Sequence, residues 1–169
     1  MLKNTFEVEI LNKLHLEEFC AFLAKQLLLF CESEVIDLNT KNFTFLLDGD
    51  LGAGKTTFVQ AMLRGLGYYK KVSSPTFTIM KEYIFNEVII HHFDLYRNEF
   101  DEPNYDLLDF FNYGINFVEW PTKGVLLLPQ EYLLLEIGSS INEEQRILNF
   151  SCSGQKYQRF LNKFMDGLK

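Results

Sequence analysis

The stretch Phe43–Gly67, FTFLLDGDLGAGKTTFVQAMLRGLG, decides the fold of this chain. Its first six residues are a short apolar run that ends at a glycine, which predicts a buried strand. From Lys55 to Leu66 the apolar side chains recur at helical spacing, which predicts an amphipathic helix. Gly67 follows, at the position where a helix commonly stops. The sequence therefore predicts a strand, a glycine-rich loop and a helix in direct succession.

The loop between this strand and this helix satisfies the P-loop pattern G-x-x-x-x-G-K-[ST] from Gly49 to Thr56. Glycines let successive backbone N–H groups turn inward and form an anion-binding nest, and the start of the helix adds partial positive charge. Lys55 can reach the outer phosphates, and the Thr56 hydroxyl can ligate Mg²⁺. The residues that we expect to contact the nucleotide here are Asp50, Leu51, Gly52, Ala53, Gly54, Lys55, Thr56 and Thr57.

The sequence favours ATP over GTP as the nucleotide. A small GTPase would carry an N-K-x-D motif, whereas LNKLH places His15 at the position of the aspartate. Hydrolysis also requires an acidic group for magnesium or for the attacking water. Two candidates end apolar runs, Asp94 in VIIHHFD and Glu119 in INFVE. Open α/β sheets bind their ligands at such strand ends.

Strand and helix patterns alternate along the chain and predict the α/β class. We expect a P-loop NTPase-like three-layer fold, with a mixed sheet and helices on both faces, formed by residues 1–169 as a single domain. Further strands are expected over 5–11, 77–85, 87–96, 115–120, 131–137 and 145–150, and further helices over 16–30, 104–111 and 155–169. The second and third of these strands are close enough for an antiparallel hairpin. The helix over 16–30 should carry acidic residues in its first turn, and the last helix, about 155–167, is appended to the domain.

Composition excludes several classes of protein. The 169 residues carry a net charge of -7, which argues against purely electrostatic binding of nucleic acid. The odd number of cysteines and the absence of C-x-x-C indicate buried free thiols in a reducing cytoplasm, not a disulfide framework or a zinc site. No apolar run is long enough to cross a membrane. His91 and His92 are adjacent on a strand and face opposite sides, so they cannot jointly bind a metal, and we expect structural roles.

Four segments in this order, GDLGAGKTTF, SSPTFTI, HFDLYR and VEWP, together resemble the bacterial TsaE (YjeE) family. The resemblance extends from about Phe6 to Ile137. It implies a P-loop ATPase required for making threonylcarbamoyladenosine in tRNA. One departure is the segment 98–116, which is shorter than in the family and contains Pro103.

The resemblance also implies roles for individual residues. Lys55 corresponds to the P-loop lysine and Thr56 to the magnesium-binding threonine. Glu119 corresponds to a glutamate associated with magnesium, Asp94 to a Walker B residue or catalytic base, and Trp120 to a tryptophan beside the nucleotide. Lys55, Asp94 and Glu119 are thus the expected catalytic residues. Ser74, Pro75, Thr76 and Phe77 correspond to a switch-like loop, and Leu11 and Asn12 lie where the family contacts the adenine side.

The implied cofactors are ATP and Mg²⁺, and the implied partners are the transferase subunits TsaD and TsaB. tRNA would be met only through that complex, and we expect the chain itself to be a monomer. Hydrolysis should be slow alone and faster in the complex, because neither Arg64 nor Arg97 is a clear arginine finger. Two alternatives remain open: a small-molecule kinase, although no arginine-rich lid is evident, and a nucleotide-dependent switch module with little turnover.

Overall fold

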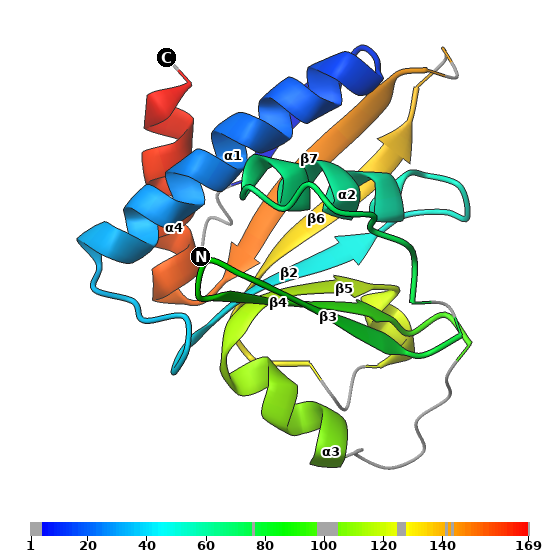
Figure 1. The fold of residues 1–169 in the computed structure, drawn as a ribbon. Helices are drawn as coiled ribbons and strands as arrows, with labels where there is room; N and C mark the ends of the chain where they lie inside the picture. The colour runs from blue at the N-terminus through cyan, green and yellow to red at the C-terminus, as the bar shows by residue number, and fades with distance from the viewer. Residues whose placement is uncertain are drawn as a thin grey trace.

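A seven-stranded mixed sheet in the order β1-β7-β6-β2-β5-β4-β3 organises the molecule (Figure 1). The computed structural model describes residues 5–75, 77–97, 105–124, 128–140, 142 and 144–168. The strands are β1 (Phe6–Ile10), β2 (Asn42–Asp48), β3 (Met80–Phe85), β4 (Val88–Asp94), β5 (Gly114–Glu119), β6 (Tyr132–Ser139) and β7 (Arg146–Ser153). The α/β class and the mixed sheet expected from the sequence are confirmed.

The centre of the sheet is parallel and its edges are antiparallel. Strand β2 runs parallel to both β5 and β6, and β5 runs parallel to β4. The pairs β1–β7, β6–β7 and β3–β4 are antiparallel. The carboxyl ends of β2, β4 and β5 therefore meet at one edge, where Asp94 and Glu119 are direct neighbours in the register.

Helices cover both faces of the sheet unequally. The helices α1 (Lys13–Ser33), α2 (Lys55–Gly65) and α4 (Gln155–Gly167) pack in one apolar core with the inner face of all seven strands. The opposite face carries the short helix α3 (Tyr105–Leu108) and the 3-10 turn η1 (Asp109–Asn112), at the bottom of Figure 1. There Phe111 stacks on Phe93 of β4, with 4.5 Å between the ring centroids. A second 3-10 turn, η2 (Pro121–Lys123), follows β5.

Helix α1 begins earlier than the apolar pattern predicts. Asn12 caps it, because the Asn12 side chain accepts a hydrogen bond from the backbone N–H of His15 at 2.9 Å. The first turn thus starts at Lys13 and holds no acidic residue, so the expectation of acidic side chains there is wrong. The cap places the start of α1 beside the P-loop, where Asn12 and Lys13 line a cavity.

Helix α2 ends as predicted. Gly67 adopts φ 103°, and the N–H of Tyr68 donates to the carbonyl of Leu63 at 2.8 Å. The N–H of Gly67 donates to the carbonyl of Arg64 at 2.9 Å, which completes a Schellman motif. The predicted apolar face of this helix is buried in the core.

The hairpin between β3 and β4 is also confirmed, although its turn dipeptide is an unusual one. Asn86 and Glu87 both adopt positive φ, 46° and 64°, as a two-residue turn of type I′ requires. Asparagine tolerates this region better than glutamate does, so pairing along the strands outweighs the local cost at Glu87. Residue 104 of the predicted helix over 104–111 lies outside the described residues.

The last helix, α4, contacts β2, the strand that precedes the P-loop. The backbone N–H of Thr44 in β2 donates to the Tyr157 hydroxyl of α4 at 2.8 Å. Phe160 packs on Phe43 of the same strand, with ring centroids 5.0 Å apart. All three cysteines are free thiols. Within the described ranges, no helix is both long and apolar enough to span a membrane.

Candidate active site

The P-loop joins the carboxyl end of β2 to the start of α2, at the right-hand edge of the sheet in Figure 1. Gly49, Gly52 and Gly54 adopt φ values of 146°, 81° and 108°, a region that other residues rarely occupy. A Cβ atom on Gly49 would also lie 2.6 Å from the carbonyl oxygen of Ile137. Glycine is therefore required at this position by both conformation and space.

The Lys55 side chain lies inside the loop and is 4% exposed. Its Nζ donates to the carbonyl oxygens of Gly49 at 2.6 Å and Asp50 at 2.9 Å. The same ammonium lies 3.6 Å from the centroid of the Trp120 ring, a cation–π contact. Burial lowers the pKa of Lys55, and the nearby carboxylates, Glu119 foremost, oppose that shift. The loop thus holds a buried cation at its centre.

The side chains of Thr56, in α2, and Glu119, at the end of β5, are hydrogen-bonded to each other. The Thr56 hydroxyl donates to Oε1 of Glu119 at 2.7 Å, and Glu119 is 3% exposed at the end of β5. Because the single hydroxyl hydrogen is used on the carboxylate, both oxygen lone pairs of Thr56 stay available to a cation. A hydroxyl beside a carboxylate is a donor set that suits Mg²⁺, which prefers oxygen ligands.

Asp94 lies in the same row of the sheet as Glu119 and is 5% exposed. Its Oδ2 accepts from the Ser74 hydroxyl at 3.2 Å, and its Oδ1 accepts from the N–H of Tyr96 at 3.1 Å. Ser74 belongs to the predicted switch-like loop, so this loop reaches the second carboxylate directly. Thr76 lies outside the described residues. Phe77 is 86% exposed, and the Arg97 guanidinium lies 4.9 Å from the centroid of its ring.

Two cavities meet at the P-loop. One, of about 480 Å³, brings together the predicted catalytic groups with the aromatic and arginine side chains beyond them: Leu51, Lys55, Thr56, Ser74, Asp94, Tyr96, Arg97, Glu119 and Trp120. The other, of about 460 Å³, lies between the loop, the start of α1 and the ends of β6 and β7. Gly52, Gly54 and Thr57 line both cavities.

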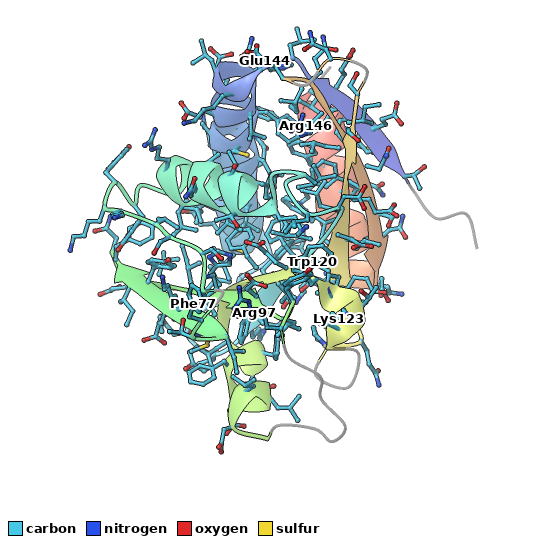
Figure 2. All side chains as sticks on the ribbon, turned by 90° about the vertical axis from the view of Figure 1, so that its right-hand side faces the viewer. Phe77, Arg97, Trp120, Lys123, Glu144 and Arg146 are labelled. Carbon is cyan, nitrogen blue, oxygen red and sulfur yellow. The ribbon has the colours of Figure 1, made fainter. Side chains whose placement is uncertain are left out.

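Figure 2 labels two residues of each cavity. Glu144 and Arg146, which line the cavity of about 460 Å³, stand at the upper end of the view, whereas Trp120 and Arg97, which line the other cavity, lie lower. A ligand that wraps around the loop can occupy both cavities, with its anionic part over the glycines that they share.

Most residues predicted from the P-loop lie in these two cavities, and Asn12 lies in the second. Three further residues had no local sequence signal as site residues. Nε of Arg146 donates to the carbonyl of Ala53 at 2.9 Å. Glu144 and Arg146 both line the cavity of about 460 Å³. His92 contacts Glu119. All three lie far from the P-loop in sequence, and of the three Arg146 contacts the loop itself.

The acidic groups near Thr56 do not form a metal site with three protein ligands among the described residues. The described part of the chain contains no group of three or more His, Cys, Asp or Glu side chains arranged for a metal. A magnesium ion commonly takes only one or two protein ligands and completes its shell with phosphate oxygens and water. Thr56 and Glu119 fit that pattern.

Known proteins share both the sequence and the fold. Residues 15–148 match the family described as "Threonylcarbamoyl adenosine biosynthesis protein TsaE". The protein of that description from Bacillus subtilis (strain 168) is 40% identical over 113 residues, which cover 66% of this chain and 71% of the relative. Its counterpart from Haemophilus influenzae is 44% identical over 95 residues, covering 54% and 60%.

The fold similarity extends beyond the family match. The crystal structure of Bacillus subtilis YdiB superposes with a TM-score of 0.77 at 25% sequence identity. The superposition covers 100% of this chain and 99% of that chain, so it includes the last helix, which lies beyond residue 148. Because the family match spans residues 15–148, well over half of the 169 residues, the chain belongs to the TsaE family of threonylcarbamoyl adenosine biosynthesis proteins.

Proposed function

We propose that this chain binds ATP with Mg²⁺ and hydrolyses it as a subunit of the machinery that makes threonylcarbamoyladenosine in tRNA. The observation that carries the proposal is the hydrogen bond between Thr56 of the P-loop helix and Glu119 at the end of β5. It joins a phosphate-binding element to an acidic strand end, the combination that nucleotide hydrolysis requires.

We expect the backbone of the P-loop to bind the phosphates. Successive N–H groups of the glycine-rich turn and the amino end of α2 attract anions. Lys55 can exchange its two carbonyl acceptors for phosphate oxygens without leaving the loop. A charged acceptor strengthens such hydrogen bonds.

Glu119 and Asp94 have different proposed roles, one at the Mg²⁺ site and the other at the attacking water. Glu119 orients the Thr56 hydroxyl, whose lone pairs and the adjacent carboxylate would hold Mg²⁺. When bound, Mg²⁺ supplies Lewis-acid stabilisation of the phosphoryl oxygens. Asp94 would orient the attacking water and accept its proton, a role supported by the position of its carboxylate in the lining of the same cavity. Ser74 holds that carboxylate through Oδ2.

The cavity of about 460 Å³ is the proposed place of the adenosine. Its lining combines the apolar side chains of Ile10, Phe58 and Leu148 with the polar side chains of Asn12 and Arg146. Nucleotide sites commonly combine apolar walls with a few polar groups that fix orientation. The absence of an N-K-x-D motif favours adenine over guanine as the base.

The proposed partners are TsaD and TsaB, with tRNA met only through that complex. The net charge of -7 is compatible with this indirect contact. An arginine supplied by a partner can accelerate hydrolysis by about 10³ to 10⁵. Hydrolysis should therefore be slow for the isolated chain and faster in the complex.

Phosphate release from ATP tests the proposal, measured with Mg²⁺ for the chain alone and with TsaD and TsaB added. Lys55→Ala should abolish binding or turnover, and Glu119→Ala should mainly lower the Mg²⁺-dependent rate. Lys123→Ala, an exposed lysine just beyond Trp120, is a control that should behave as wild type. Equal turnover with and without the partners would refute the partner role.

The same assay separates the two alternatives. A small-molecule kinase would yield a phosphorylated metabolite instead of free phosphate. A switch module would bind TsaD in the presence of ATP and leave the ATP concentration unchanged over hours. Failure of the folded chain to bind adenine nucleotide with Mg²⁺, with or without its partners, would refute the proposal as a whole.

A further inference from the structure

The imidazole of His92 lies directly behind Glu119. His92 is in β4, two residues before Asp94, and it is wholly buried. Its Nε2 lies 2.7 Å from Oε1 of Glu119. In the parallel register of β4 and β5, His92, Asp94 and Glu119 share one face of the sheet. The same carboxylate oxygen thus faces His92 on one side and Thr56 on the other.

The chemistry of the pair fixes the direction of this hydrogen bond. An ionised carboxylate only accepts hydrogen bonds, so Nε2 of His92 must carry the hydrogen. Oε1 of Glu119 then accepts two hydrogen bonds of 2.7 Å, one from the imidazole and one from the Thr56 hydroxyl. Oε2 has no hydrogen-bond partner among the described residues and remains available to a cation or to its water shell.

Stability alone does not account for histidine at this position. Nδ1 of His92 is buried and makes no hydrogen bond to any described residue. A buried polar atom without a partner destabilises the folded state, because it has lost its hydrogen bond to water. An apolar side chain of similar size would fill the same space without that cost, so the benefit of the imidazole must come from its contact with Glu119.

The neighbouring His91 provides the contrast. It is equally buried but faces the other side of the sheet. Its Nδ1 lies 2.8 Å from Oδ1 of Asn116, and its Nε2 lies 3.2 Å from Oε2 of Glu82. Both ring nitrogens of His91 thus lie within hydrogen-bonding distance of side chains on the neighbouring strands β5 and β3, and neither contacts the candidate site. The structural role expected from the sequence fits His91 and is incomplete for His92.

We propose that His92 is a positioning residue, which locks the Glu119 carboxylate in the orientation that supports magnesium-dependent nucleotide binding. The inference rests on the proposed function, in which Thr56 and Glu119 hold Mg²⁺. Without the imidazole, the carboxylate can rotate and its hydrogen bond with Thr56 weakens. Loss of such a supporting contact typically lowers metal affinity by about 10- to 100-fold.

A pair of amide substitutions tests the role of the Nε2 donor. The amide nitrogen of His92→Gln lies about as far from the backbone as Nε2 of the imidazole and can still donate to Glu119. His92→Asn carries the same amide one carbon shorter and cannot reach. His91→Asn is the matched control, because it also removes a buried imidazole but on the opposite face.

The measurement is the Mg²⁺ concentration that half-maximally supports ADP binding, followed by calorimetry or by fluorescence of Trp120, the single tryptophan of the chain. His92→Asn should raise this concentration by about 10- to 100-fold, and His92→Gln should restore it. Binding of ADP in EDTA should be unchanged in both. His91→Asn should lower the melting temperature and leave the Mg²⁺ requirement as in wild type.

The outcomes separate this inference from the proposed function. A wild-type Mg²⁺ requirement in His92→Asn would overturn the inference and leave the proposed function intact. Nucleotide binding by the wild-type protein that is independent of Mg²⁺ would also overturn the inference, whereas failure of the wild-type protein to bind adenine nucleotide with Mg²⁺ would overturn the proposed function. If His92→Asn fails to fold, His92→Leu also removes the Nε2 donor without introducing a buried amide. An unchanged Mg²⁺ requirement in His92→Leu would then overturn the inference.

Discussion

Replacing Lys55 by methionine should weaken nucleotide binding and leave the stability of the fold nearly unchanged. The ammonium can make at least two hydrogen bonds to phosphate oxygens, each contributing about 1.5–3 kcal/mol. Against these stand the two present bonds from the same ammonium to the neutral carbonyls of Gly49 and Asp50, at about 1.5 kcal/mol each. The net loss is about 0–3 kcal/mol, and a middle value of about 1.5 kcal/mol corresponds to a Kd about 13-fold weaker.

The stability of the Lys55→Met protein should change little. Methionine keeps most of the apolar stem, and the buried charge, whose cost is visible in the lowered pKa of Lys55, disappears. That gain offsets the two lost hydrogen bonds and the contact with Trp120. We expect the free energy of unfolding to stay within about 1 kcal/mol of wild type.

Calorimetric titration with ADP and Mg²⁺, together with thermal melting, checks both expectations. Lys123→Met is the matched control, because that lysine is exposed and lies next to the site without lining it. If Lys55→Met melts as wild type and binds within about threefold of the wild-type Kd, the backbone nest alone holds the phosphates. The electrostatic role assigned to Lys55 would then be wrong.

Asp94, Tyr157 and Lys55 each make a contact whose loss or change can be measured. Asp94→Asn keeps the side-chain shape and removes the proton acceptor, so ATP hydrolysis should fall by about 10² or more while ADP affinity measured by calorimetry is retained. Tyr157→Phe leaves the buried N–H of Thr44 without its acceptor and should lower the free energy of unfolding by about 1–3 kcal/mol in urea titrations. Phosphates favour the charged form of Lys55, whose pKa burial holds below the ordinary 10.5, so ADP binding should weaken as pH rises through that lowered pKa and should take up a proton in that pH range. Calorimetry in buffers of different ionisation enthalpy measures this proton uptake, which Lys55→Met should abolish.

Local patterns predicted the parts of the site that are continuous in sequence. The P-loop needs glycine at fixed offsets because its backbone adopts positive φ, so the motif is visible in the sequence. Asp94 and Glu119 were recognisable as acidic ends of apolar runs, and their expected position at one edge of the sheet follows from parallel pairing. These features are fixed by backbone conformation and by neighbours along the chain.

The contacts of Arg146 and His92 could not be found in this way, because they depend on pairings between distant segments. Arg146 reaches the carbonyl of Ala53, 93 positions away, only because β7 folds back antiparallel beside β6. His92 meets Glu119 because the register of β4 and β5 places them on the same face. A shift of one residue would have brought His91 to that face instead.

The charges around the P-loop give a physical reason for the proposed magnesium requirement. Lys55 stands near the carboxylates of Asp48, Asp50, Asp94 and Glu119, four acidic groups around one ammonium. A triphosphate adds several negative charges to this acidic site, and in a partly buried cavity that repulsion is poorly screened by salt. A divalent cation beside Thr56 would reduce the repulsion, whereas Lys55 alone already faces an excess of negative charge. ATP should therefore bind this chain more weakly in EDTA than with Mg²⁺, and removing one acid, as in Glu119→Gln, should narrow that difference.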